Sequence, residues 1–269
     1  MTVTAPGVEQ ITIRKCNSLD EFKACVALQK EVWNFDDVDM VPLRMFVVSY
    51  KIGGQIVGAF DAGKNDELLG FAFSIPGARG GRPYLHSHML AVRERWRNHG
   101  LGRRLKLAQR DDAILRGFEL MEWTFDPLEI KNAHLNLVRL GAIARRYSVN
   151  HYGSSSSPLQ GGLPTDRLVA EWWLKSRRVS NLLDRAQGPQ FAIDKKISVP
   201  AEIYSWKAST AERSKAAEVQ TRNREEFVSA FAQGLTALGY ERDGAGNGAF
   251  LLGRWDENLS FGAACEVGE

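Results

Sequence analysis

Apolar and polar residues alternate along the first fifty positions in a way that predicts one strand and two helices. Residues 11–14 alternate like a short strand. Ser18 and Glu21 have the spacing of a capping box, and the apolar positions that follow repeat with helical period as far as Trp33. A second short helix is expected at 42–48, opened by a proline. The chain therefore begins with a strand followed by two helices.

Three further strands and a helix are expected next. The strands are predicted at 55–62, 67–75 and 84–92, because apolar residues are continuous or alternate there. The glycine-rich segment 76–82 is expected to be a flexible loop. From Leu101 onward the apolar residues form one helical stripe, which Gly117 is expected to end.

The second half of the chain changes in composition after residue 176. Its predicted elements are a strand at 118–126, a helix at 127–140, strands at 145–152 and 167–174, a helix at 221–238 and a hairpin at 240–254. The segment that follows residue 176 is polar and resembles a linker. We therefore expect one domain at 1–176, and a linker with a small α+β C-terminal appendage at 177–269. Three roles fit the appendage: packing on the main domain, covering an acceptor site, or forming a homodimer.

Composition limits the function classes. The chain has 269 residues, 44% of them hydrophobic, and a net charge of +3 that is too small to indicate nucleic acid binding. Its three cysteines show neither metal-ligand spacing nor a paired framework, which is typical of a reducing compartment. There is no signal-like start and no apolar run of membrane-spanning length. We expect a cytoplasmic protein with no nucleic acid or membrane partner.

The segment 86–102 is the strongest chemical signal in the chain. It is predicted to be a strand, a glycine-broken turn and the start of a helix, and the N–H groups at such a helix start attract phosphate oxygens. Two arginines follow the pair Gly100 and Gly102, and the third glycine of a dinucleotide fingerprint is absent. No Gly-Lys-Ser/Thr follows either, so the nucleotide triphosphatase loop is also excluded. The turn expected to hold the phosphates consists of Arg97, Asn98, His99, Gly100, Leu101, Gly102 and Arg103.

The pattern Arg97-x-x-Gly100-x-Gly102 after an apolar strand resembles the acyl-coenzyme A motif of the GNAT superfamily of N-acyltransferases. The predicted order of elements from about residue 10 to 176 is also the order that this family uses. The resemblance implies an α/β fold with a mixed central sheet flanked by helices, and acetyl-CoA or another acyl-CoA as cosubstrate. It further implies that backbone groups of Leu90, Ala91 and Val92 bind the pantetheine, and that Asn132 and Asn136 contact the same molecule.

Two histidines stand on the predicted strand before the turn. His86 and His88 project to one face, because side chains alternate along a strand. An amine must lose its proton to attack a thioester, and histidine titrates in the neutral range. The strand is similar to that of arylalkylamine N-acetyltransferases, in which paired histidines deprotonate the amine. In another interpretation the pair only lines the cleft, and Glu94 or Glu122 is the base.

The same pair could instead be half of a metal site, which needs further ligands. The other histidines, His99, His134 and His151, are not positioned by sequence to complete one. We therefore expect no metal.

The sequence departs from the family where a tyrosine often protonates the departing thiolate. Leu137 stands at that position, so the usual general acid is missing. Tyr147 is the candidate replacement, with Tyr152 as the alternative, and a buried structural tyrosine is an equally valid interpretation. No covalent acyl-enzyme is expected, because no cysteine lies in the region of the histidines.

Several short motifs are similar to a poorly characterised bacterial branch of the superfamily, some members of which acylate or succinylate amino acids. On that resemblance Arg79, Arg82 and Arg167 are candidates to bind a substrate carboxylate, since guanidinium groups bind carboxylates bidentately. The expected function is transfer of an acetyl or succinyl group to the primary amine of a small molecule. A non-catalytic acyl-CoA sensor and a protein-lysine acetyltransferase are the alternatives.

Overall fold

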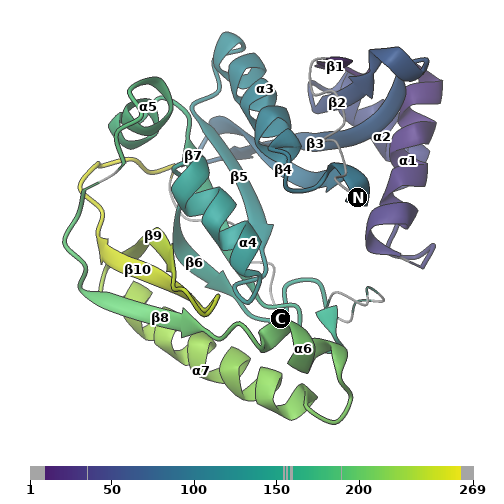
Figure 1. The fold of residues 1–269 in the computed structure, drawn as a ribbon. Coiled ribbons are helices and arrows are strands. Elements are labelled where there is room, and N and C mark those ends of the chain that lie inside the picture. Colours follow the sequence, from purple (N-terminus) through teal and green to yellow (C-terminus); the bar gives the residue numbers. More distant parts are fainter. Residues whose placement is uncertain are drawn as a thin grey trace. The chain divides into compact units, whose positions relative to one another are not determined.

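The computed structural model describes residues 10–34, 36–153, 155, 157, 160–188 and 190–261. The chain forms two compact units, Met1–Gly77 with Leu85–Gly117, and Ala78–Tyr84 with Phe118–Glu269. Both units combine antiparallel strands with helices, so the expected α/β class is confirmed (Figure 1). The predicted boundary between residues 176 and 177 lies inside the second unit.

The first unit contains a sheet in the order β1-β2-β3-β4, of which the pairs β1/β2 and β2/β3 are antiparallel. Its elements are β1 (Ile11–Lys15), α1 (Leu19–Trp33), α2 (Leu43–Lys51), β2 (Gln55–Asp61), β3 (Glu67–Arg79), β4 (Arg82–Val92) and α3 (Leu101–Leu115). The last residues of β3 and the first residues of β4 belong to the second unit. The capping box at the start of α1 is confirmed, since Glu21 N donates to Ser18 Oγ.

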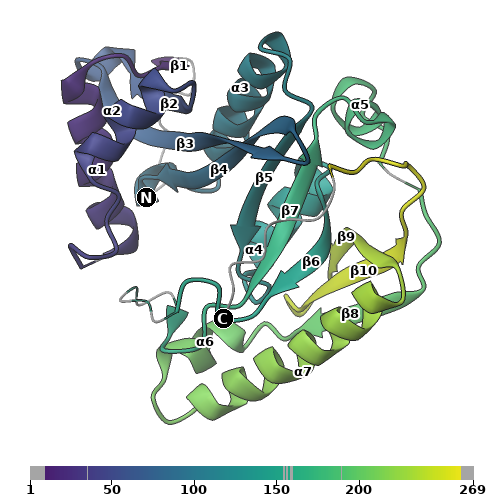
Figure 2. The same ribbon diagram turned by 180° about the vertical axis from the view of Figure 1, so that it is seen from behind.

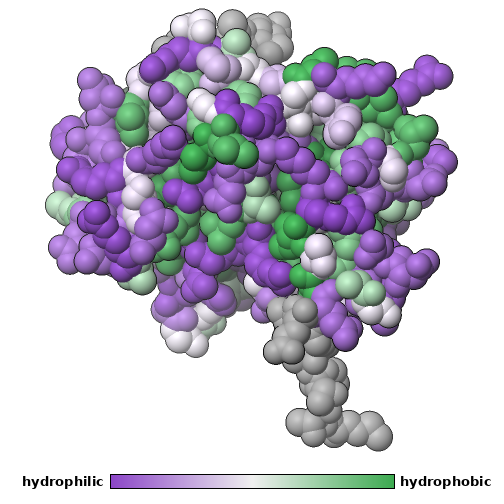
Figure 3. All heavy atoms as spheres, turned by 90° about the horizontal axis from the view of Figure 1, so that it is seen from above, coloured by the Kyte–Doolittle hydropathy of each residue, from purple (hydrophilic) through white to green (hydrophobic). Residues whose placement is uncertain are grey.

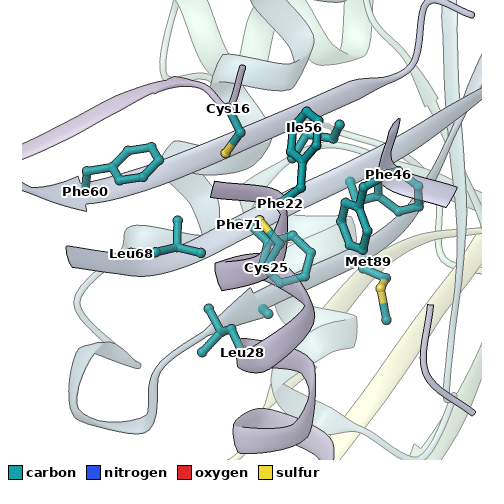
Figure 4. Close-up of a cluster of buried hydrophobic side chains, with 12 residues drawn as sticks. Cys16, Phe22, Cys25, Leu28, Phe46, Ile56, Phe60, Leu68, Phe71 and Met89 are labelled. Atoms are coloured by element: carbon teal, nitrogen blue, oxygen red, sulfur yellow. The ribbon is translucent and has the colours of Figure 1, made fainter. Parts of the chain in front are cut away.

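Hydrophobic residues cover both faces of this sheet. On one face, aromatic residues of β3 and helix α2 pack with Cys25 and Leu28 of α1, as Figure 4 shows. On the other, residues of β2 and β3 pack against Leu101 and Leu105 of α3. Successive residues of a strand belong to different clusters, as the period of two requires: Phe71 faces the first cluster and Ala72 the second. The sheet is thus fixed between helices on both sides.

The prediction of a flexible loop at 76–82 is wrong. β3 extends to Arg79 and β4 begins at Arg82, which leaves only Gly80 and Gly81 between them. Both glycines have positive φ values, 55° and 73°, which is the requirement of a two-residue hairpin turn. The glycines therefore make a tight turn between two long strands.

The second unit contains a sheet in the order β5-β7-β6-β9-β10-β8. Its elements are β5 (Leu120–Phe125), α4 (Ile130–Ala133), a π-helix (His134–Arg139), β6 (Ile143–Ser148), β7 (Arg167–Trp173), α5 (Arg177–Asp184), β8 (Lys195–Val199), α6 (Ile203–Ala208), α7 (Arg213–Ala232), β9 (Leu235–Arg242) and β10 (Gly248–Arg254). Helices α4 and α7 lie on opposite faces of the sheet (Figures 1 and 2).

Two predicted helices of this unit differ from the structure, and the C-terminal hairpin is confirmed as β9 and β10. The helix expected at 127–140 is one turn of α-helix followed by a six-residue π-helix. The helix expected at 221–238 spans Arg213–Ala232, because Gly234 at φ 77° ends it and β9 pairs with β10 and β6. Sheet pairing thus overrides helical spacing from Leu235 onward.

The surface carries mainly hydrophilic residues on the face seen in Figure 3, with hydrophobic residues between them in small groups. Of the helices in the described part of the chain, none has the length and apolar character needed to cross a membrane.

Candidate functional site

The turn between β4 and α3 has the geometry of an anion site. After β4 a short 3₁₀ turn buries Trp96, and the chain then reaches α3 through Asn98 and Gly100, whose φ values are 65° and 76°. Gly100 is the N-cap of α3 and has a left-handed backbone that glycine adopts without strain. The first-turn N–H groups of α3 lack acceptors within the helix, so they and the helix dipole attract negative charge.

Arginines hold this turn in place. Arg93 Nε donates to Leu68 O at 2.8 Å, and Arg104 Nη2 donates to Ile11 O at 3.0 Å. Arg97, the arginine of the motif, donates from Nε to Val92 O at 3.2 Å. Part of the cationic excess predicted for the phosphate site thus has a structural role, because these side chains fix the turn to β1, β3 and β4.

The glycines leave room beside the turn. A Cβ atom added at Gly100 would meet nothing within 4 Å, and one at Gly102 would only reach ordinary contact with Leu90 Cδ2 at 3.6 Å. Neither glycine is therefore required by packing within the protein. Open space next to helix N–H groups fits the diphosphate of coenzyme A, whose oxygens need close approach to the backbone.

His86 and His88 lie together, as predicted from the strand period. Their ring centroids are 6.0 Å apart. The ring centroids of His88 and Phe73 are 6.2 Å apart, and these two rings are in a T-shaped arrangement. Both histidines are half-buried. Burial beside the apolar cluster lowers the pKa of His88 below its usual value, because desolvation disfavours the imidazolium. His88 is therefore neutral at pH 7 and able to accept a proton.

The alternation of β4 is broken between the histidines and the turn. Ser87 faces α3, since it accepts a hydrogen bond from Lys106 Nζ at 2.7 Å, and Leu90 also packs with the α3 cluster. Residues three apart on a regular strand would face opposite sides. The strand therefore departs from regular alternation between these two residues.

A buried polar network lies under the histidine strand, and periodicity gave no sign of it. Lys106 Nζ donates to Ser87 Oγ, which in turn donates to Gln109 Oε1 at 3.0 Å. Gln55 Nε2 donates to Gln109 O at 2.9 Å and to Asp112 Oδ2 at 2.8 Å. Burial lowers the pKa of Lys106 well below its usual range. The network ties β2 and β4 to α3.

The candidate general acid Tyr147 belongs to the second unit. Its hydroxyl donates to Asp166 Oδ2 at 2.7 Å, and its ring stacks on Phe227. Burial and the bond to Asp166 raise the pKa of Tyr147, so it holds its proton tightly. The alternative, Tyr152, is 48% exposed and its hydroxyl lies 2.8 Å from Thr124 Oγ1.

The alternative base Glu122 is part of an ionic network that the sequence did not reveal. Arg79 binds it through two bonds of 2.7 and 2.5 Å, and Arg146 donates to it as well. Its cross-strand neighbour Glu171 accepts from Arg145 and Arg146. A register shift between Ala144 and Tyr147 in β6 lets both consecutive arginines reach Glu171. Glu122 is thus neutralised by two cations, which disfavours a role as base, whereas Glu94 is exposed on the turn after β4.

The other two predicted arginines have different surroundings from Arg79. Arg82 is exposed, lies 3.5 Å from Glu119 and covers the ring of Phe261. Arg167 donates to Asp166 O and Gln160 Oε1, and its guanidinium lies 5.5 Å from the ring centroid of Tyr152.

The two candidate asparagines differ in exposure. Asn132 is exposed on α4, and Asn136 is buried in the π-helix one turn later. Leu137, at the position of the family's tyrosine, is fully buried. Within the described residues, no group of three or more His, Cys, Asp or Glu side chains could hold a metal ion.

Comparison with known proteins finds a family match for part of the chain. Residues 16–135 match the family model described as "Acetyltransferase (GNAT) family". A search of curated proteins finds no match.

Solved structures with similarity to this chain include the following three. The ribosomal-protein-S18-alanine N-acetyltransferase of Escherichia coli is 14% identical, with a TM-score of 0.49, and the match covers 62% of this chain and 95% of that one. A GNAT family acetyltransferase of Elizabethkingia anophelis with acetyl-CoA bound is 14% identical, with a TM-score of 0.45 and coverages of 61% and 99%. An aminoglycoside acetyltransferase from an uncultured soil metagenomic sample is 17% identical, with a TM-score of 0.41 and coverages of 46% and 84%.

The family match spans α1 to α3, with the histidine strand and the turn at Gly100, and continues through β5 into the π-helix. Residues 16–135 of the chain therefore match the GNAT family of acetyltransferases.

Proposed function

We propose that this acetyltransferase moves an acetyl or succinyl group from a coenzyme A thioester to the primary amine of a small molecule, with amino acids as the first candidates. The observation that carries the proposal is the pair His86 and His88 on one face of β4, at a ring distance of 6.0 Å. The same strand leads into the anion-binding turn at Gly100. Proton acceptance and phosphate binding are thus supported by one rigid element of the first unit.

In this proposal the turn 97–103 binds the diphosphate through the N–H groups at the start of α3, and the backbone of 90–92 holds the pantetheine. The bound thioester supplies the electrophilic carbonyl, which a backbone N–H near Leu90 polarises. Asn132 and Asn136 contact the same cosubstrate, as the family resemblance implies.

His86 and His88 take the proton from the attacking amine. The lowered pKa of His88 supports this role, because it keeps the imidazole neutral at pH 7 and ready to accept a proton. A covalent acyl-enzyme is not part of the proposal, since Cys16 and Cys25 are buried in the first core cluster and Cys265 lies outside the described residues. Tyr147 remains the candidate general acid in this proposal, although its raised pKa makes release of its hydroxyl proton less favourable.

The proposed acceptor carries a carboxylate. Arg82 and Arg167 are the better candidates to bind it, because the terminal nitrogens of Arg79 bind the Glu122 carboxylate in a bidentate contact, whereas Arg82 is exposed and Arg167 bonds only neutral oxygens. For Arg79 to take part, its pairing with Glu122 would have to be exchanged for the substrate.

A free-thiol release assay tests the proposal. Acetyl-CoA and succinyl-CoA are offered with a panel of amino acids, simple amines and a folded lysine-containing protein. We expect amine-dependent release with an amino acid, and loss of turnover with retained coenzyme A affinity when His86 and His88 are both replaced by alanine. Release only with the folded protein would indicate a protein-lysine acetyltransferase, and cofactor binding without release would indicate a sensor.

A further inference from the structure

The helical segment that carries Asn132 and Asn136 is held at its start by helix α6. Lys207 of α6 is only 5% exposed, and its Nζ lies 2.9 Å from Asp126 Oδ2 and 2.9 Å from Glu129 Oε1. These two carboxylates flank the passage from β5 to α4. Such a buried cation is stabilised only while both partners stay in place.

The other end of the segment is held by α5. Arg178 is 8% exposed, and its Nε donates to Gly141 O at 2.9 Å and its Nη2 to Leu137 O at 3.2 Å. It also donates to Leu238 O of β9. The carbonyls at the end of a helix lack donors within the helix, and a cation there is favoured by the helix dipole. Both ends of the segment are thus held by residues that follow position 176.

The segment between these contacts has an uncommon geometry. Leu140 N donates to Leu135 O at 3.0 Å, a bond that spans five residues, and the π-helix covers His134–Arg139. Short π-helical turns are rare and need outside support. Relaxation to a regular α-helix would shift the chain by one residue, about 100° of rotation, and would change the direction of Asn136 relative to Asn132.

From these contacts we propose that Arg178 and Lys207 form a C-terminal clamp, a pair of positioning residues that fixes the segment 130–139 for acyl-CoA binding. The proposal rests on the proposed function, in which Asn132 and Asn136 contact the cosubstrate. It gives the region after residue 176 a role in the acetyltransferase site itself. The clamp residues act through the segment and do not touch the reacting atoms.

The test compares Lys207→Met with the matched control Lys196→Met in the full chain. Lys196 is an exposed lysine of β8 that pairs with Glu241 of β9. Two readouts are measured: the Kd of coenzyme A by calorimetry, and hydrogen exchange of the peptide 130–142. We expect Lys207→Met to raise the Kd about 3- to 30-fold and to speed exchange in that peptide, with Lys207→Arg restoring both in part. Lys196→Met should change neither.

Unchanged Kd and unchanged exchange in a folded Lys207→Met protein overturn the clamp. If that variant does not fold, Arg178→Lys is used instead, because it keeps the positive charge but removes the guanidinium that donates to both Gly141 O and Leu137 O. For it we expect a rise in Kd of at least about twofold, near the lower limit of such coupling. If the wild-type chain itself binds no coenzyme A, the proposed function fails, and hydrogen exchange alone then decides whether the clamp orders the segment.

Discussion

Replacing Glu122 by glutamine tests whether its carboxylate is structural or acts as the catalytic base. Glu122 is 3% exposed and accepts from both terminal nitrogens of Arg79, at 2.7 and 2.5 Å, as well as from Arg146. Glutamine has nearly the same shape, so the Glu122→Gln variant removes the charge while it keeps one acceptor oxygen. The change leaves Arg79 with its guanidinium largely buried and without the carboxylate it binds.

The expected cost follows from what remains of the network. Breaking a buried ion pair by removing one partner costs about 3–5 kcal/mol. Arg146 keeps a bond to Glu171 at 3.2 Å, and the amide oxygen of the introduced glutamine can still accept one bond from Arg79, so the lower end applies. We expect the free energy of unfolding to fall by about 3 kcal/mol, which corresponds to roughly 6–12 °C in Tm for a chain of this size.

The assay combines thermal unfolding, followed by circular dichroism, with kcat measured well below the new Tm. The control is Glu119→Gln, since Glu119 is 59% exposed and lies 3.5 Å from Arg82, and its change should stay within about 0.5 kcal/mol. A loss of kcat to background with an unchanged Tm would refute the structural role of Glu122. It would indicate that Glu122 is the base and that the two histidines only line the cleft.

Three further predictions concern the two units. Because burial lowers the pKa of His88 from its usual 6.5, its neutral form persists to lower pH, and the acid limb of kcat should lie below pH 6.5. His88→Gln should lower kcat by about 100-fold or more and remove this limb in a pH series, and an unchanged limb would contradict the assignment. Gly100→Ala should destabilise the fold by about 1–2 kcal/mol, since φ is 76°, and weaken coenzyme A binding measured by calorimetry. Tyr147→Phe leaves Asp166 with Arg224 as a donor, so thermal unfolding should show a loss of about 1 kcal/mol, and an equally stable variant would argue against this bond.

Local patterns predicted the elements of the first unit well. The capping box of Ser18 and Glu21 depends on residues three positions apart, so the sequence contains all the information it needs. The same holds for the shared face of His86 and His88. The turn at Gly80 and Gly81 was misjudged because several glycines in a row suggest flexibility, whereas two positive φ values in sequence make a tight hairpin.

The contacts that position the site in the second unit could not be predicted in this way. Arg178 donates a hydrogen bond to Leu137 O, 41 residues earlier in the chain, and Lys207 donates one to Asp126, 81 residues earlier. Neither side chain has a periodic or compositional signal that distinguishes it from a surface residue. The π-helix has no signal in the spacing of apolar residues, so helical spacing from 127 to 140 indicates one regular helix.

The environment of His88 also bears on how it could deprotonate an amine. An alkylammonium has a pKa near 10.4 and an ordinary histidine one near 6.5, so proton transfer between them in water is unfavourable by about 5 kcal/mol. Burial beside Phe73 lowers the pKa of His88 further, which by itself would widen this gap. The same desolvation acts on the bound amine, however, because an ammonium loses hydration in that place as an imidazolium does. An apolar surrounding therefore lowers both pKa values together, and it favours binding of the acceptor as the neutral amine that can attack.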